Sequence, residues 1–254
     1  MSTQPPLLLL HGVTMSAAAW DTVVPLLDGR FDLIVPTALG HRGARRTEGR
    51  ATIEALTDAT ESLLDERGLT TVHIAGNSLG GWMAIELARR GRATTVCALS
   101  PAGLWEPAET PGRSRETLMR TKKLADSTRL LTPSLMRSAR FRRNSFRNIA
   151  LHGDRLTVEQ ARTSFHDLVG CNAAMDLLTT TEYLHPLVDP TCPITVAWSE
   201  SDRIFPPDEF VPIARTRLPN AHFVTLRGVG HVPMIDDPAS VAQAIVDSID
   251  GHAA

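Results

Sequence analysis

The segment Gly76-Asn77-Ser78-Leu79-Gly80 holds a serine in a setting suited to nucleophilic attack. Residues 71–75 before it form a short apolar run typical of a strand, and residues 82–88 after it show helical apolar spacing. We therefore expect a strand, a sharp turn at Ser78 and a helix, with the flanking glycines allowing strand and helix to approach closely. The helix N-terminus would favour negative charge developing near the serine. The alternative is an ordinary glycine-rich turn.

Two later residues could supply the base and the acid that a serine nucleophile needs. His231 could accept the proton of Ser78, because histidine ordinarily titrates near neutral pH. Asp202 could hold the imidazole in one tautomer and stabilise the imidazolium. Glu200 is a rival acid two residues earlier. Taken singly, Asp202 could be a turn residue and His231 a loop residue, but the ordered set of three favours a catalytic triad.

Other groups are expected to complete the site. The backbone N–H groups of Val13, after the first apolar run, and of Leu79 could form an oxyanion hole. Trp105 and Val232, the residue after His231, are expected to contact the substrate. The nine histidines show no H-E-x-x-H or similar spacing, so we expect no metal and no cofactor.

These residues must be positioned by a regular framework. Apolar runs that could form buried strands are found at 6–10, 31–36, 71–75, 94–99, 193–198 and 222–226. Helical periodicity is found after Ser16 (with Trp20, Val23, Val24 and Leu27 on one face) and at 52–66, 82–88, 208–217 and 239–249. Alternating strands and helices favour an α/β fold, a mostly parallel sheet with helices on both faces. The carboxyl ends of its strands share one edge, where ligands bind.

The alternation stops after Ser100. We expect no strand between residues 101 and 190, where Thr157 begins a helix with a capping box. The sequence thus predicts a core domain formed by residues 1–100 and 191–254, and a helical lid, residues 101–190, inserted into it.

Five stretches resemble the α/β-hydrolase family in its lid-bearing form. They are Leu9-Leu10-His11-Gly12, Gly40-His41-Arg42-Gly43, Gly76-Asn77-Ser78-Leu79-Gly80-Gly81, Ser199-Glu200-Ser201-Asp202-Arg203-Ile204-Phe205-Pro206 and Gly230-His231-Val232-Pro233. The resemblance covers nearly the whole chain, and the family places its lid between the sixth and seventh strands, where residues 101–190 fall. It implies nucleophile Ser78, acid Asp202 and base His231.

The sequence departs from the family pattern in two places. The family usually has two strands before the histidine–glycine motif, whereas six residues precede Leu7, so we expect those two strands to be missing. The strand before the lid ends in Ser100 and not in a carboxylate, which removes the acid position that some relatives use and favours Asp202. An uncovered apolar sheet edge invites pairing with another chain, so a homodimer is a further expectation.

The expected reaction is hydrolysis of a small carboxylic ester, thioester or lactone through an acyl-enzyme. Epoxide hydrolases and dehalogenases of this fold use an aspartate at the position of Ser78. Carbon–carbon hydrolases of diketone-type acids are an alternative, because they share the pair Asn77-Ser78, although they usually carry tryptophan where Val232 stands. Cofactor-free haloperoxidase or perhydrolase chemistry would use the same triad. A ligand receptor on the same fold is the non-enzymatic alternative.

Composition limits the partners and the location. The net charge of −2 argues against nucleic-acid binding through bulk charge, and three cysteines are too few for a disulfide framework, which favours the cytoplasm. The apolar run Leu7 to Leu10 is too short for a signal peptide or a membrane span. Between Gly112 and Arg147, eleven basic residues outnumber two acidic ones. They could form a solvated surface or attract an anionic substrate.

Overall fold

A single parallel sheet forms the framework of the molecule. The computed structural model describes residues 4–105 and 112–251. Within them six strands lie in the order β2-β1-β3-β4-β5-β6, and every neighbouring pair is parallel. The strands are β1 (Pro6–Leu10), β2 (Asp32–Ile34), β3 (Val72–Asn77), β4 (Ala93–Leu99), β5 (Ile194–Ser199) and β6 (His222–Leu226). The predicted α/β class is confirmed, and each strand begins and ends within two residues of its prediction.

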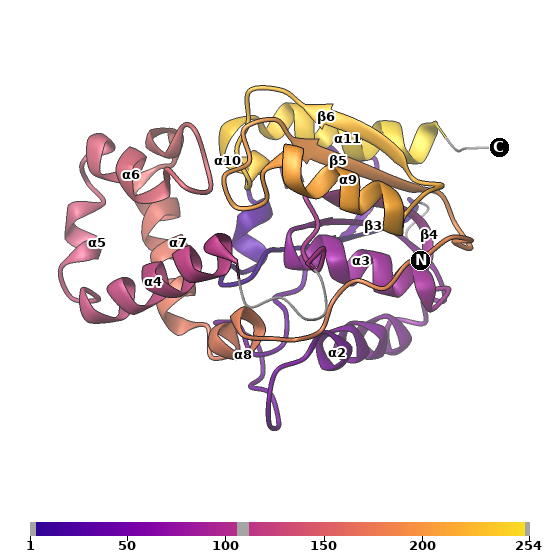
Figure 1. The fold of residues 1–254 in the computed structure, drawn as a ribbon, viewed down its shortest axis with the longest axis horizontal. Helices are drawn as coiled ribbons and strands as arrows, with labels where there is room; N and C mark the ends of the chain where they lie inside the picture. The colour runs from indigo at the N-terminus through magenta and orange to yellow at the C-terminus, as the bar shows by residue number, and fades with distance from the viewer. Residues whose placement is uncertain (1–3, 106–111, 252–254) are drawn as a thin grey trace.

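Helices cover both faces of the sheet (Figure 1). In β1, Leu8 and Leu10 belong to one hydrophobic cluster, while Leu7 and Leu9 belong to the cluster on the opposite face, as alternate strand residues must. The first cluster includes α2 (Ile53–Glu66), α3 (Leu79–Arg89) and α9 (Pro207–Arg217); the second includes the 3-10 helix η1 (Ala17–Trp20), α1 (Val24–Leu27) and α11 (Pro238–Asp250). Burial on both faces explains why the strands read as continuous apolar runs.

The single helix predicted after Ser16 was wrong in its extent. The chain instead forms η1 and then the short helix α1, separated by turn residues. Pro25 explains the interruption, because proline has no backbone N–H to donate to the carbonyl four residues earlier. The predicted apolar face survives in part, since Trp20, Val23 and Leu27 are buried.

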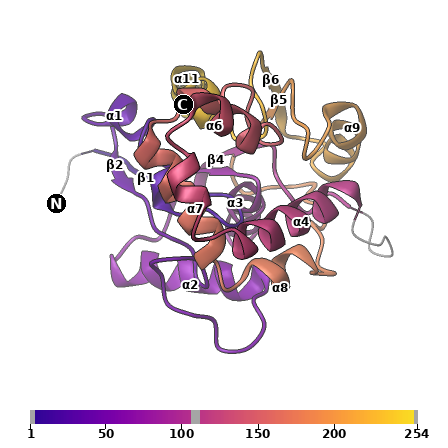
Figure 2. The ribbon, with the colours of Figure 1, turned by 90° about the vertical axis from the view of Figure 1, so that its left-hand side faces the viewer.

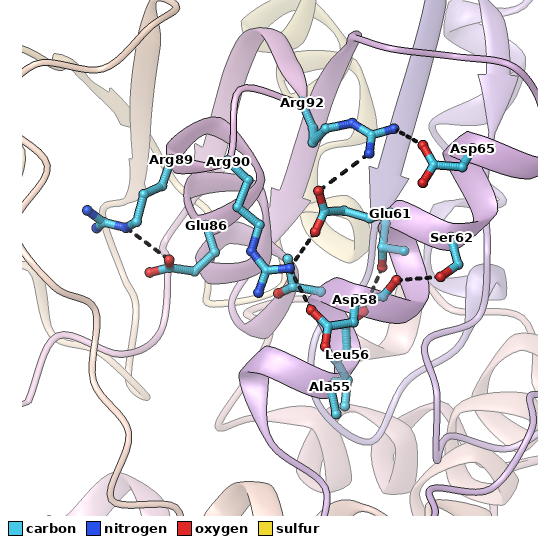
Figure 3. A network of polar contacts seen from close by, with 12 residues as sticks. Ala55, Leu56, Asp58, Glu61, Ser62, Asp65, Glu86, Arg89, Arg90 and Arg92 are labelled. Atoms are coloured by element: carbon cyan, nitrogen blue, oxygen red, sulfur yellow. Dashed lines mark hydrogen bonds and ion pairs between the residues drawn. The ribbon is translucent and has the colours of Figure 1, made fainter.

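A network of ion pairs joins α2 to the end of α3 and the start of β4 (Figure 3). Arg90 pairs with Asp58 at 2.6 Å and with Glu61, and Arg92 pairs with Asp65 at 2.7 Å and with Glu61 at 3.4 Å. Exposed pairs of this kind contribute little stability one by one. Together they hold α2 beside α3, the helix that begins directly after Ser78.

The chain between β4 and β5 contains helices and turns but no strand in its described part, residues 100–105 and 112–193. Its helices are α4 (Arg113–Ser127), α5 (Thr132–Leu135), α6 (Ala139–Phe146), the 3-10 helix η2 (Gly153–Arg155), α7 (Val158–Gly170) and α8 (Ala174–Leu178). The capping box predicted at Thr157 is present, with Gln160 as its partner. Figure 1 shows α4, α5, α6 and α7 grouped beyond one end of the sheet, and Figure 2 views the molecule from that end, with α4, α6 and α7 in front of the strands. None of the helices in the described ranges combines the length and apolar character needed to cross a bilayer.

The edges of the sheet bear on the predicted homodimer. The three-residue strand β2 forms one edge and β6 forms the other. A short edge strand offers few backbone groups to a pairing partner. The homodimer therefore stays a prediction.

Candidate active site

Ser78 lies in a strained turn between β3 and α3. Its φ of 56° and ψ of −113° place it in a region that residues other than glycine rarely adopt. The end of β4 and the loop after it hold Ser78 there, because the Ser78 N–H donates to the Leu99 carbonyl at 2.9 Å and the Ser78 carbonyl accepts from the Ala102 N–H at 3.0 Å. Strain of this kind persists only where the surroundings impose it. The turn brings the Ser78 side chain to the wall of a cavity.

The two flanking glycines are required by close backbone packing. A Cβ atom on Gly76 would lie 2.2 Å from the carbonyl oxygen of Gly80, and one on Gly80 would lie 2.2 Å from the carbonyl oxygen of Leu10. Neither backbone atom can move aside cheaply. The glycines thus allow α3 to begin against β1 and β3, as the sequence predicted for this turn.

Asp202 and His231 meet after the ends of β5 and β6. His231 Nδ1 lies 2.7 Å from Asp202 Oδ2, and both side chains are buried. The other oxygen, Asp202 Oδ1, accepts from the backbone N–H groups of Ile204 and Phe205, each at 2.8 Å. With Asp202 as acceptor, the proton of the imidazole lies on Nδ1, so Nε2 is left free to accept one.

Three contacts that the sequence did not predict hold the His231 loop. The Asn77 amide donates to the His231 carbonyl at 2.9 Å, the Val232 N–H donates to the Ile149 carbonyl at 2.8 Å, and Asp236 accepts from the Gly230 N–H at 2.8 Å. Asp236 lies in the short helix α10 (Pro233–Asp236). The only sequence signals were the position of Asn77 beside Ser78 and an acid five residues after His231.

The rival acid Glu200 lies elsewhere. Its side chain is exposed and accepts from the Gly228 N–H at 2.9 Å, in the loop before His231. Asp202, in contrast, is buried against the imidazole. The structure thus brings together Asp202 and His231, and gives Glu200 a role in the turn.

The predicted oxyanion donors both border a cavity next to Ser78. Val13 and Leu79 line a cavity of about 40 Å³ that also touches Ser78 and Trp105. Leu79 is the first residue of α3, so its N–H has no acceptor within the helix. Among the described residues the Val13 N–H donates to no other group either. Trp105 is held by a hydrogen bond of 2.8 Å from its indole N–H to the Glu182 carbonyl.

A larger cavity of about 230 Å³ lies between the sheet edge and the helical segment. Ser78, His231, Val13 and Val232 line its floor. Its other walls are mostly apolar side chains of α4 to α7, among them Leu118, Met136, Phe141, Phe146, Phe165 and Leu168. The described lining contains no lysine, arginine, aspartate or glutamate. Val232 therefore lies where the sequence expected a substrate contact.

The Ser78 hydroxyl and the imidazole backed by a carboxylate line the larger cavity, and the residues of the two free backbone N–H groups line the smaller cavity; Ser78 and Val13 border both cavities. Such a set can attack a carbonyl carbon and stabilise the oxyanion that forms. Within residues 4–105 and 112–251, no three histidine, cysteine, aspartate or glutamate side chains are grouped in a way that could hold a metal ion.

Two buried histidines shape the loops beside Val13. His11 Nδ1 contacts the Gly12 carbonyl at 2.8 Å, while His11 Nε2 accepts from the Ala38 N–H at 3.0 Å. The His41 ring lies edge-on to it, with centroids 5.0 Å apart. Burial, reinforced by His41, lowers the pKa of His11 to about 3, and burial also lowers the pKa of His41. Both rings are therefore neutral at physiological pH.

We expect these histidines to make the fold sensitive to acid. Above pH 6.5, the ordinary pKa of histidine, these side chains are neutral in the folded and the unfolded chain. Below pH 6.5 the unfolded chain binds protons that the folded chain excludes, down to about pH 3 for His11. Each such histidine lowers the free energy of unfolding by up to about 1.4 kcal/mol per pH unit. Thermal unfolding from pH 7 to pH 5 should show a shallower loss of stability in His11→Gln than in the wild type. The exposed His222→Gln is the control, and equal slopes for all three proteins would contradict the assignment.

Comparison with known proteins covers almost the whole chain. The model of the alpha/beta hydrolase family matches residues 7–244. Epoxide hydrolase EphH from Mycobacterium tuberculosis is 33% identical over 202 residues, which are 77% of this chain and 94% of that protein. A pimeloyl-[acyl-carrier protein] methyl ester esterase from Aromatoleum aromaticum is 29% identical over 98% of this chain and 99% of its own length. A thermophilic esterase from Thermogutta terrifontis has a similar structure, with a TM-score of 0.75 and 25% identity over 99% of this chain and 91% of its own.

Proposed function

This chain belongs to the alpha/beta hydrolase family, and we propose that it cleaves small carboxylic esters, thioesters or lactones through an acyl-enzyme on Ser78. The observation that carries the proposal is the Asp202–His231 hydrogen bond of 2.7 Å at the wall of the cavity that Ser78 also lines. In this pair His231 would be the base for Ser78, and Asp202 would fix the tautomer of the His231 imidazole.

In the proposed acylation, Ser78 Oγ attacks the ester carbonyl carbon while His231 Nε2 accepts the hydroxyl proton. The carbonyl oxygen becomes an oxyanion, which the N–H groups of Val13 and Leu79 stabilise. The positive end of α3, which begins at Leu79, supports the same charge. Asp202 stabilises the imidazolium without taking its proton.

The intermediate then collapses and the leaving oxygen takes the proton from His231. Water enters in place of the alcohol, and His231 removes one of its protons as it attacks the acyl carbonyl. The same two N–H groups stabilise the second oxyanion, and Ser78 regains its proton when the acid leaves. Helices α4 to α7 surround the cavity and form the proposed lid, residues 101–190, over a core of residues 1–100 and 191–254.

The relative that is named an epoxide hydrolase raises a second reaction. Attack of a serine oxygen on an epoxide carbon would form an ether. An ether has no carbonyl carbon for water to attack, so the enzyme would stop after one turnover. An acyl-enzyme does have such a carbon. Ser78 therefore supports ester cleavage over epoxide opening.

The carbon–carbon hydrolase alternative loses part of its support. The Asn77 amide donates to the carbonyls of Leu99 and His231, so a purely positional role accounts for this residue next to Ser78. Haloperoxidase or perhydrolase chemistry would use the same groups as ester cleavage, and substrate tests separate them.

The two cavities suggest which esters fit. The apolar cavity of about 230 Å³ suits a hydrocarbon chain, and the cavity of about 40 Å³ beside Val13 and Trp105 suits a small group. Each methylene that becomes buried adds about 0.8 kcal/mol of binding, or about fourfold. We propose a neutral ester with one apolar chain and one small substituent.

A series of p-nitrophenyl esters with acyl chains from acetyl to octanoyl tests the proposal, together with a dienone acid and styrene oxide. We expect kcat/KM to rise by up to about fourfold per methylene until the cavity is full, with no turnover of the other two substrates. A fluorophosphonate should label Ser78 alone. Turnover of the dienone acid or the epoxide above that of every ester, or labelling of another residue, would overturn the assignment.

An anionic substrate stays a prediction that the walls of the larger cavity do not support. The one charged residue in the described lining of the smaller cavity, Arg115, donates to the Leu178 and Thr180 carbonyls. The basic residues Lys123, Arg129, Arg137 and Arg140 are exposed, and the described lining of the large cavity carries no charge apart from what His231 can take up. In the same ester series, added salt should change kcat/KM equally for a neutral ester and for a carboxylate-bearing ester of equal size. A selective fall for the anionic ester would instead indicate steering by the surface charge.

The cytoplasmic location also belongs to the proposal. The free cysteines Cys97, Cys171 and Cys192 are buried, and burial raises the pKa of each thiol. This cysteine usage suits a reducing compartment.

A further inference from the structure

Exposed leucines gather at one corner of the helical segment. Leu124, Leu130, Leu131 and Leu135 are 64%, 85%, 69% and 49% exposed. They lie where α4 is followed by α5, at the end of the molecule that is remote from the sheet (Figure 1). We call residues 124–135 the leucine corner. Several large apolar side chains exposed together indicate a surface that meets an apolar partner.

Basic residues lie within the leucine corner and on both sides of it. Lys123, Arg129, Arg137 and Arg140 are exposed, and in the described part of the chain none of them has an acidic side chain within 4.0 Å. The acid within the corner, Asp126, is paired with Lys122 at 2.5 Å. The exposed leucines are thus surrounded by basic side chains that no acidic side chain of the described residues neutralises.

The leucine corner and the large cavity share residues. Leu124 is 64% exposed and also lines the cavity that Ser78 and His231 share. Thr128, in the turn after α4, lines it as well. The corner is therefore next to the apolar wall of the cavity that Ser78 lines.

We propose that the leucine corner binds the surface of an anionic lipid bilayer. Leu130 and Leu131 enter the boundary between headgroups and acyl chains, and the flanking Lys and Arg side chains pair with headgroup phosphates. A bilayer surface supplies both the apolar depth and the negative charge that such a site needs. A second copy of this chain does not, because a two-fold contact would place the same basic residues against each other.

Vesicle co-sedimentation of the whole protein tests this binding without any turnover, so it is independent of the proposed reaction. We expect binding to vesicles of phosphatidylcholine with one third phosphatidylglycerol, weaker binding to phosphatidylcholine alone, and release by added salt. Arg137→Gln with Arg140→Gln should weaken partitioning by about 25-fold, at about fivefold for each charge. Leu130→Ser with Leu131→Ser should weaken it by about tenfold or more.

Matched controls change exposed residues elsewhere. Arg45→Gln with Arg46→Gln and Leu26→Ser, at exposed positions away from the corner, should bind vesicles as the wild type does. Far-UV circular dichroism checks that each variant is folded. Absence of vesicle binding, equal binding to neutral and anionic vesicles, or unaltered binding by the corner variants would overturn the proposal. So would light scattering that finds a dimer which Leu130→Ser with Leu131→Ser converts to a monomer, because the corner would then contact a second copy.

Discussion

Replacing Ser78 with alanine is expected to lower kcat for ester hydrolysis by about 10⁴- to 10⁶-fold. The change removes the oxygen that would form the acyl-enzyme. The remaining rate would come only from substrate binding in the cavity and from the oxyanion donors. The fold should persist, because the turn is held by the backbone of Ser78, through Leu99 and Ala102, and not by its hydroxyl.

Initial rates on the best p-nitrophenyl ester, with the thermal unfolding midpoint measured in parallel, check this expectation. Ser164→Ala is the matched control, since it removes a hydroxyl from the wall of the same cavity. We expect the Ser164 variant to stay close to the wild-type rate. A Ser78→Ala protein that is folded and retains wild-type activity would show that the chemistry does not involve this serine.

Asp202→Asn is expected to lower kcat by about 10⁴-fold. An asparagine fills the same volume, and its oxygen can still accept from the Ile204 and Phe205 N–H groups. Its NH₂ group would then face His231 Nδ1, where Asp202 Oδ2 now accepts at 2.7 Å. Two donors cannot pair, so the imidazole would adopt the other tautomer, in which Nδ1 accepts from the asparagine and Nε2 carries the proton and can no longer accept one from Ser78. The loss should appear in kcat and hardly in KM, because the substrate contacts are unchanged.

Glu200→Gln is the control for this experiment. Its side chain is exposed and bonded to the Gly228 N–H, so the rate should stay within about twofold of the wild type, as for most surface changes. The double variant Ser78→Ala with Asp202→Asn should be no slower than Ser78→Ala alone. The effects of residues that act as a unit are not additive, and without the serine the acid has no further step to assist. A loss in Glu200→Gln as deep as that in Asp202→Asn would reassign the acid.

Much of the framework follows from the sequence because it depends on local patterns. Continuous apolar runs mark strands buried on both faces, and they located β1, β3, β4, β5 and β6 to within two residues. The capping box at Thr157 marked the start of α7, and the glycines around Ser78 marked the turn between β3 and α3. Parallel strands end at one edge, so the order of motifs along the chain was enough to assign Ser78, Asp202 and His231 to a common region.

Tertiary structure decided what local patterns do not encode. The sequence favoured Asp202 over Glu200 through the family motif, but the contacts of the two acids depend on the turn after β5, which directs Asp202 toward His231 and Glu200 toward Gly228. The clamp on the His231 loop joins Asn77, Ile149 and Asp236, residues from distant parts of the chain. Such contacts depend on how elements pack, which has no period along the chain.

The helical segment shows the same division. Its arginines and leucines could be counted in the sequence, but their separation into an uncharged cavity wall and an exposed leucine corner depends on how α4 to α7 pack on one another. Helical periodicity can mark the buried side of each helix, but it does not say whether that side faces the cavity or a neighbouring helix. The sequence therefore determined that a serine, a histidine and an acid meet at one sheet edge. The packing decided which hydrogen bonds the two acids make, what space lies beside the serine and which side chains of the helical segment stay exposed.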